Sequence, residues 1–89
     1  INVVMTHIGG YPGKYRASVK KQLVDEDIQL FISGHSHILK VMPDKKLDLL
    51  HINPGASGTQ GFHHRITMVR FKINGNNIED LEVFDAPRT

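Results

Sequence analysis

The sequence predicts an α/β domain made mostly of β-strands with one main helix. Three observations support this prediction: short apolar runs that end in polar or glycine-rich segments, one segment with helical spacing, and an Asn-Gly pair between two alternating stretches. The 89 residues are 39% hydrophobic and 22% charged, which is ordinary for a globular domain and too apolar for a disordered chain. The length allows a single domain, residues 1–89.

The first part of the chain should alternate strand, helix and strand. Residues 2–6 form an apolar run, which is typical of a strand buried on both faces. Residues 15–24 carry apolar side chains at every fourth position, which predicts a helix. The helix should end at the acids of residues 25–27, because negative charge is unfavourable at the carboxyl end of the helix dipole. Residues 28–33 are the second predicted strand.

The second part of the chain predicts an antiparallel arrangement. A turn at residues 43–46 and a hairpin turn at residues 74–77 separate pairs of apolar segments. The tail, residues 85–89, is expected to be frayed. The strands predicted in this part are residues 38–42, 49–52, 65–73 and 78–84.

Polar motifs follow three of the predicted strands. They are Thr6-His7, the Gly34–His37 segment and the Asn53–Gly55 segment. Because ligand sites in open α/β sheets lie beyond the carboxyl ends of the strands, we expect all three to converge on one site.

His35 and His37 are the strongest candidates for metal ligands. In extended backbone, residues two apart place their side chains on the same side, and neutral imidazole is the commonest transition-metal ligand. Gly34 allows a sharp turn just before them. The alternative is that they are surface histidines at a strand end. His7 also follows an apolar strand. It is a candidate metal ligand only in combination with His35 and His37.

For three other features we favour a structural interpretation over a functional one. The composition of the Asn53–Gly55 segment predicts a tight turn. The functional alternative is a rigid loop that faces an anion. The His63–Arg65 segment is better explained as a solvated strand entry than as a phosphate contact through the guanidinium group. His51 alternates with apolar neighbours and is interpreted as a strand residue.

Together these motifs, with Asn53-Pro54-Gly55 extended to Ala56-Ser57, resemble the calcineurin-like metallophosphoesterase superfamily, and most of all its small bacterial phosphodiesterases. The resemblance covers nearly the whole chain. It implies the carboxy-terminal half of an α/β/β/α sandwich, in which a strand hairpin closes the second sheet and two metals lie at the ends of the central strands.

The resemblance also implies roles for individual residues. His7 and His35 would bind the second metal and His37 the first, with manganese, iron or zinc as the ions. The loop at residues 61–65 departs from the commonest form in the family. The candidates for substrate binding are Gly34, Asn53 and Arg65.

The amino-terminal motifs of the family, Asp-x-His, Gly-Asp and Gly-Asn-His, do not occur in this sequence. The chain also opens on Ile1 inside an apparent strand, so we expect it to begin within a longer protein. The parent is expected to hydrolyse a small phosphate ester, by analogy a phosphodiester, whereas this chain alone should have no catalytic residue and no activity. An exposed edge at residues 2–6 would then favour self-association.

Two alternatives from other classes stay open. One is a non-catalytic protein-interaction scaffold of the same fold, as in the retromer subunit. The other is a small zinc-binding domain that takes a fourth ligand from His51, His63 or His64. Discriminating them requires the upstream sequence and the metal content of the protein.

Composition argues against several partners and environments. The sequence has no cysteine, so no disulfide framework is expected, and no apolar run approaches the roughly 18–20 residues of a membrane helix. A net charge of +2 with dispersed basic residues gives no strong signal for nucleic acid. We expect a cytoplasmic protein, although a missing amino terminus would hide a signal peptide.

Overall fold

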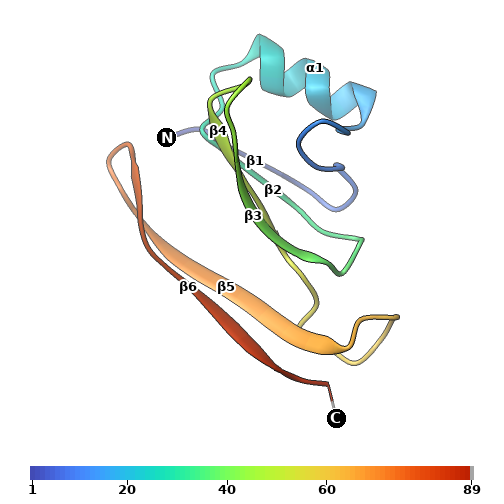
Figure 1. The fold of residues 1–89 in the computed structure, drawn as a ribbon. Coiled ribbons are helices and arrows are strands. Elements are labelled where there is room, and N and C mark those ends of the chain that lie inside the picture. The colour runs from blue at the N-terminus through green and yellow to red at the C-terminus, as the bar shows by residue number, and fades with distance from the viewer. Residues whose placement is uncertain (89) are drawn as a thin grey trace.

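The computed structural model describes residues 1–88, which fold into one helix and six strands (Figure 1). The mixed α/β class, with mostly strands and a single helix, is confirmed. The elements are β1 (Val3–Thr6), α1 (Ala17–Asp25), β2 (Leu30–Ser33), β3 (Leu39–Asp44), β4 (Leu49–Pro54), β5 (Arg65–Asn74) and β6 (Asn77–Pro87).

Strands β1 to β4 form one mixed sheet in the order β1-β2-β4-β3. β1, β2 and β4 are parallel, in a register that aligns Val3 with Leu30 and Leu30 with Leu50, while β3 runs antiparallel to β4. The carboxyl ends of the three parallel strands therefore meet at one edge of the sheet. This edge is where the predicted polar motifs begin.

Helix α1 covers one face of this sheet and forms the core with it. Leu23 of the helix packs with Phe31 of β2 and Leu49 of β4, which are all almost completely buried. The helix begins at Ala17, two residues later than predicted, because Arg16 has extended backbone (φ −60°, ψ 144°) and donates its N–H to the Gly9 carbonyl at 3.1 Å. It ends at Asp25, within the acidic segment that the sequence indicated.

The prediction that the first strand is buried on both faces is wrong. β1 is an edge strand, and Val3 and Met5 are 42% and 71% exposed. Only Val4 packs against the core under α1. The run is apolar, but the described residues cover Val3 only in part and leave most of the Met5 side chain exposed.

The boundary predicted for the third strand is also wrong. β3 continues through Pro43 to Asp44, and the turn shifts to residues 45–48. A proline is compatible with a strand here because β3 lies at the edge of the sheet, where a missing N–H donor costs no ladder hydrogen bond.

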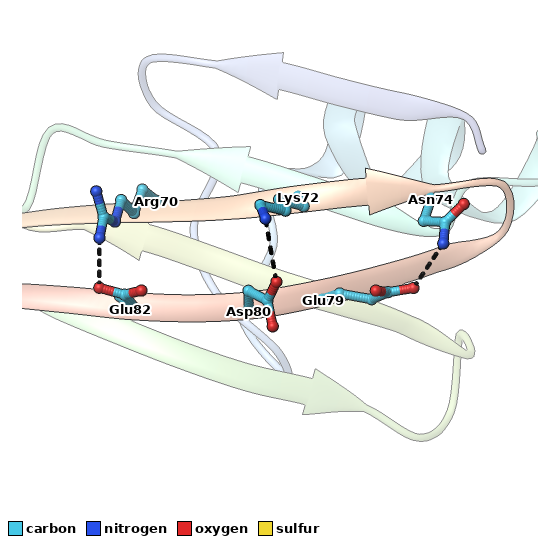
Figure 2. A network of polar contacts seen from close by, with 6 residues as sticks. All are labelled: Arg70, Lys72, Asn74, Glu79, Asp80 and Glu82. Carbon is cyan, nitrogen blue, oxygen red and sulfur yellow. Dashed lines mark hydrogen bonds and ion pairs between the residues drawn. The ribbon is translucent and has the colours of Figure 1, made fainter.

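β5 and β6 form a separate two-stranded ribbon, which lies on the side of the sheet away from α1 (Figure 1). The predicted hairpin is confirmed: Asn74 pairs with Asn77, and Gly75 takes a φ of +61° that glycine adopts without strain. The tail is not frayed through residue 87, because Arg65 pairs with Pro87; Thr89 lies outside the described residues. Cross-strand pairs line the exposed ribbon, as Figure 2 shows: Arg70–Glu82, Lys72–Asp80 and Asn74–Glu79.

The single helix in the described part of the chain is too short to cross a membrane.

Candidate metal centre at the carboxyl edge of the sheet

The three predicted motifs converge, as expected from the parallel strands. The Gly34 N–H donates to the His7 carbonyl at 2.9 Å, which joins the ends of β1 and β2. The Asn53 amide at the end of β4 donates to the Gly34 carbonyl at 3.2 Å and to the Ser36 hydroxyl at 3.0 Å. Hydrogen bonds thus connect all three strand ends into one framework that positions the histidines.

His7 and His35 form a close pair at this edge. His7 Nε2 and His35 Nδ1 lie 3.3 Å apart, with the rings edge to face. Two imidazole nitrogens bound to one tetrahedral ion at about 2.0–2.1 Å would lie about 3.3 Å apart. The separation in this pair therefore fits two ligands of one metal ion, and the donor type fits manganese, iron or zinc.

His37 does not join that pair and contacts His63 instead. The Nδ1 atoms of His37 and His63 lie 3.1 Å apart, again with the rings edge to face. The prediction of extended backbone is wrong: His35 and His37 have φ values of 71° and 62°, in the left-handed region. A tight turn, in which the Ser36 N–H donates to the Gly34 carbonyl at 2.9 Å, encloses His35, and the Ile38 N–H after His37 donates to the Ser36 hydroxyl at 3.2 Å. The two histidines therefore do not follow an extended strand, and they have different partners.

The loop at residues 55–64 brings His63 to the site. Sequence reasoning named His63 only as one of three possible fourth ligands of a small zinc-binding domain, and did not predict its contact with His37. His63 Nε2 lies 2.7 Å from the Gly58 carbonyl. Arg88 holds the same loop, because its guanidinium donates to the carbonyls of Gly61 at 2.7 Å and His63 at 2.9 Å. The departure of residues 61–65 from the usual family pattern was a signal in the sequence that this loop is unusual, but it did not indicate a partner for His63.

Two predicted substrate-binding residues have local partners in the structure. Asn53 is buried, and its amide is fully engaged because its oxygen also accepts the Gly55 N–H at 3.0 Å. Arg65 donates through Nε to Asp85 at 2.8 Å across the ribbon, and both side chains are about half exposed. Gly34 lies between the His7 carbonyl and the Asn53 amide. Their roles toward a substrate stay predictions.

His51 is a strand residue, in agreement with its alternation in the sequence. It is completely buried in β4 against Phe31 and Tyr15, and neither ring nitrogen makes a hydrogen bond to the described residues. Burial lowers the pKa of His51, and the charge of Lys40 acts in the same direction. The imidazole is therefore neutral near pH 7.

A cavity of about 330 Å³ adjoins the His7–His35 pair on the side of His35. Its walls combine apolar groups with a few polar ones, a composition typical of small-molecule sites. Lys40 contributes the cationic group, held 4.4 Å above the Tyr11 ring. The residues that define the cavity include Ile8, Tyr11, His35, Ile38, Lys40 and His51.

The histidines lie at the carboxyl edge of a mixed sheet, which is where ligand sites of open α/β sheets are found. Residues 1–76 match the family model described as the calcineurin-like phosphoesterase superfamily domain, so the chain belongs to this family. Members of the family are generally hydrolases of phosphate esters that use divalent metal ions. No curated protein matches the chain.

Within residues 1–88, no three His, Cys, Asp or Glu side chains are arranged to hold one metal ion. The histidines of the site instead form two pairs, so each pair supplies at most two donors to an ion. The number of donors, rather than their type or spacing, is what these residues lack for a complete centre.

Proposed function

We propose that this chain is part of a phosphodiesterase with a two-metal centre, to which it contributes His7, His35 and His37. The observation that supports this proposal most directly is the 3.3 Å separation of His7 Nε2 and His35 Nδ1. Membership of the phosphoesterase family gives that pair its chemical context.

In this proposal His7 and His35 hold the second ion and His37 holds the first. The remaining ligands, including the bridging carboxylate, belong to a preceding segment of the same protein, and the 89-residue chain alone is inactive. When bound, the ions supply the positive charge that stabilises the transition state of phosphate-ester hydrolysis. Manganese, iron and zinc all suit a ligand set of imidazoles and carboxylates.

The cavity beside His35 gives the proposal a place for the organic part of a small ester. Ile8, Ile38 and Tyr11 supply apolar walls, and Lys40 supplies a cation that favours a substrate with a second negative group. Such a group would reach the cavity while the phosphate lies near the histidine pair. A small, anionic phosphodiester is therefore the substrate class that we propose.

The test compares His35→Ala with His64→Ala in the protein expressed with its native flanking sequence. His64 is a matched control because it is exposed at the entry to β5, near the site but outside both histidine pairs. Metal content is measured by mass spectrometry and hydrolysis with bis(4-nitrophenyl) phosphate. We expect His35→Ala to lose one ion and about 1,000-fold of the rate, because the Lewis-acid effect of a metal amounts to several kcal/mol. Full metal content and full activity in His35→Ala would refute the proposal.

We also propose that the isolated chain self-associates, because it leaves two surfaces uncovered. β1 is an edge strand with Met5 71% exposed, and the ribbon exposes Met68 and Phe84 at 46% and 51%. Unpaired edge groups beside apolar side chains are a template for pairing with another chain. Light scattering should show oligomers that Met5→Lys reduces; a monomer at all concentrations would contradict this.

A further inference from the structure

We propose that His63 is a positioning residue that orients the metal ligand His37 and fixes which of its ring nitrogens faces the ion. The proposal rests on the proposed function in one respect, namely that His37 binds a metal. His63 lies in the loop whose role the sequence left open, and it contributes no ligand in the family pattern described above.

The contact with Gly58 determines which nitrogen of His63 carries the proton. Its Nε2 atom lies 2.7 Å from the Gly58 carbonyl oxygen, which can only accept a hydrogen bond. Nε2 must therefore carry the proton and donate it. In the neutral ring the other nitrogen, Nδ1, is then an acceptor with a free lone pair.

The contact with His63 in turn determines which nitrogen of His37 carries the proton. The two Nδ1 atoms lie 3.1 Å apart, and that of a neutral His63 ring protonated at Nε2 has no proton to donate. His37 Nδ1 must therefore be the donor, since two facing lone pairs would repel each other. The only lone pair left on a neutral His37 ring is at Nε2, so Nε2 is the atom that can bind a metal.

The chain of hydrogen bonds from Gly58 through His63 to His37 thus has one consistent direction. A metal-bound histidine usually donates its second ring N–H to such a partner, which fixes the tautomer, orients the ring and raises the basicity of the ligand. Here the partner is itself anchored by a backbone carbonyl. His37 is therefore held in the form that a metal requires before any metal arrives.

The surrounding loop is shaped for this contact. Gly61 has a φ of +115°, and a side-chain carbon at this position would collide with the His37 ring. Only glycine adopts this backbone and leaves room for the imidazole. Arg88 fixes the loop from the outside through the Gly61 and His63 carbonyls. Close packing, hydrogen bonding and backbone conformation all place His63 against His37.

The ring nitrogens of the His7–His35 pair are arranged differently from those of the His37–His63 pair. There the facing atoms are Nε2 and Nδ1, and among residues 1–88 neither ring has a carbonyl partner of the kind that Gly58 provides to His63. In that pair the two facing nitrogens are both free to bind one ion. In the His37–His63 pair, by contrast, the His63 ring orients the His37 ring and does not bind the ion.

The experiment uses the protein with its native flanking sequence and compares His63→Ala, His63→Gln and the control His64→Ala. Zinc affinity is measured by competition with a chelator. Loss of a hydrogen-bond partner to a metal ligand typically weakens metal binding about 10- to 100-fold. We therefore expect His63→Ala to lower the zinc affinity of the site that contains His37 by about 10- to 100-fold. Two ions should still bind at saturation. His63→Gln should recover most of the affinity, because one amide offers both a donor for Gly58 and an acceptor for His37. His64→Ala should bind like the unaltered protein.

A second readout needs neither metal nor activity. Nitrogen-15 NMR of the metal-free protein at mildly alkaline pH should show His37 protonated at Nδ1 and His63 protonated at Nε2. If the protein neither binds zinc nor hydrolyses phosphodiesters, the proposed function fails, while these spectra still report on the hydrogen-bond chain.

Three results would overturn the positioning role. One is a His37 ring protonated at Nε2 in the unaltered protein. Another is a His63→Ala variant that saturates with one ion fewer, which would make His63 a ligand itself. The third is a His63→Ala variant that folds and binds zinc as tightly as His64→Ala.

Discussion

The sheet under α1 and the β5–β6 ribbon differ in how they bury their apolar side chains. The six apolar residues that are almost completely buried lie in α1, β2, β4 or the turns beside them: Leu23, Ile28, Leu30, Phe31, Leu49 and Ile52. In the ribbon, Thr67 is the buried residue among those described, and it is held by its hydrogen bond to the Pro54 carbonyl at 2.7 Å. The sheet is thus stabilised by burial, whereas the ribbon is stabilised mainly by its own cross-strand pairs.

The ribbon has apolar pairs on both faces. Met68 pairs with Phe84, and the next pair along, Val69 with Val83, points to the opposite face. Strands that are apolar on both faces are typical of a layer covered on both sides. The radius of gyration, 13.4 Å, also exceeds the value of about 12 Å expected for a compact chain of this length. The comparison favours a sandwich in which further elements would cover the ribbon.

The largest expected effect separates two phenylalanines, one in each region. Phe31→Ala should destabilise the fold by about 3–5 kcal/mol, because it removes a completely buried ring from the contact between α1 and the sheet. Phe84→Ala removes the same ring from the ribbon, where it is 51% exposed, and should cost about 1 kcal/mol or less. Urea unfolding of both variants measures the difference.

The unfolding free energies of these two variants also test whether the ribbon is covered in the intact protein. In the 89-residue chain the two substitutions should differ strongly. In the protein with its native flanking sequence, a covered ribbon would bring the cost of Phe84→Ala toward that of Phe31→Ala. Equal costs in the short chain would contradict the division into a buried and an exposed region.

The sequence predicts the sheet better than it predicts the site. Short apolar runs followed by polar residues locate β1, β2 and β4, and parallel pairing then brings His7, Gly34 and Asn53 to one edge. This inference succeeds because strand direction and the position of strand ends depend on local pattern. The local pattern alone predicts a strand buried on both faces, and the exposed edge at residues 2–6 follows only from the expectation that this strand lacks its neighbours. Exposure depends on which neighbours a strand has in space, which no local pattern specifies.

The partner of His37 could not be predicted from the sequence, for a physical reason. Its contact with His63 joins residues 26 positions apart through a loop whose path depends on Gly61 and on Arg88 at the far end of the ribbon. No local periodicity encodes such a path. His37 also has a left-handed backbone, with a φ of 62°, so a rule for extended strands could not place its side chain.

A smaller effect is expected where the edge strand β3 meets the core. The Tyr15 hydroxyl donates to Asp44 Oδ2 at 2.7 Å, and the backbone N–H groups of Lys46 and Leu47 donate to Oδ1 of the same carboxylate. Burial alone would raise the pKa of Asp44, but these hydrogen bonds outweigh it and lower that pKa below 3.8. Tyr15→Phe should cost about 1–3 kcal/mol near pH 7, because it leaves a buried carboxylate oxygen without its partner.

The pH dependence of this cost identifies its origin. A lowered pKa in the folded state means that Asp44 contributes stability above its unfolded value of 3.8, and that this contribution is lost as the pH falls through the folded value. Burial, followed by the bond to Asp44, raises the pKa of Tyr15, so its contribution is complete below pH 10.0 and declines in more alkaline solution. The difference in unfolding free energy between the unaltered chain and Tyr15→Phe should therefore be constant between these limits and shrink on both sides. Unfolding curves collected across this range would separate a hydrogen bond from simple packing, since lost packing would give a difference that does not change with pH.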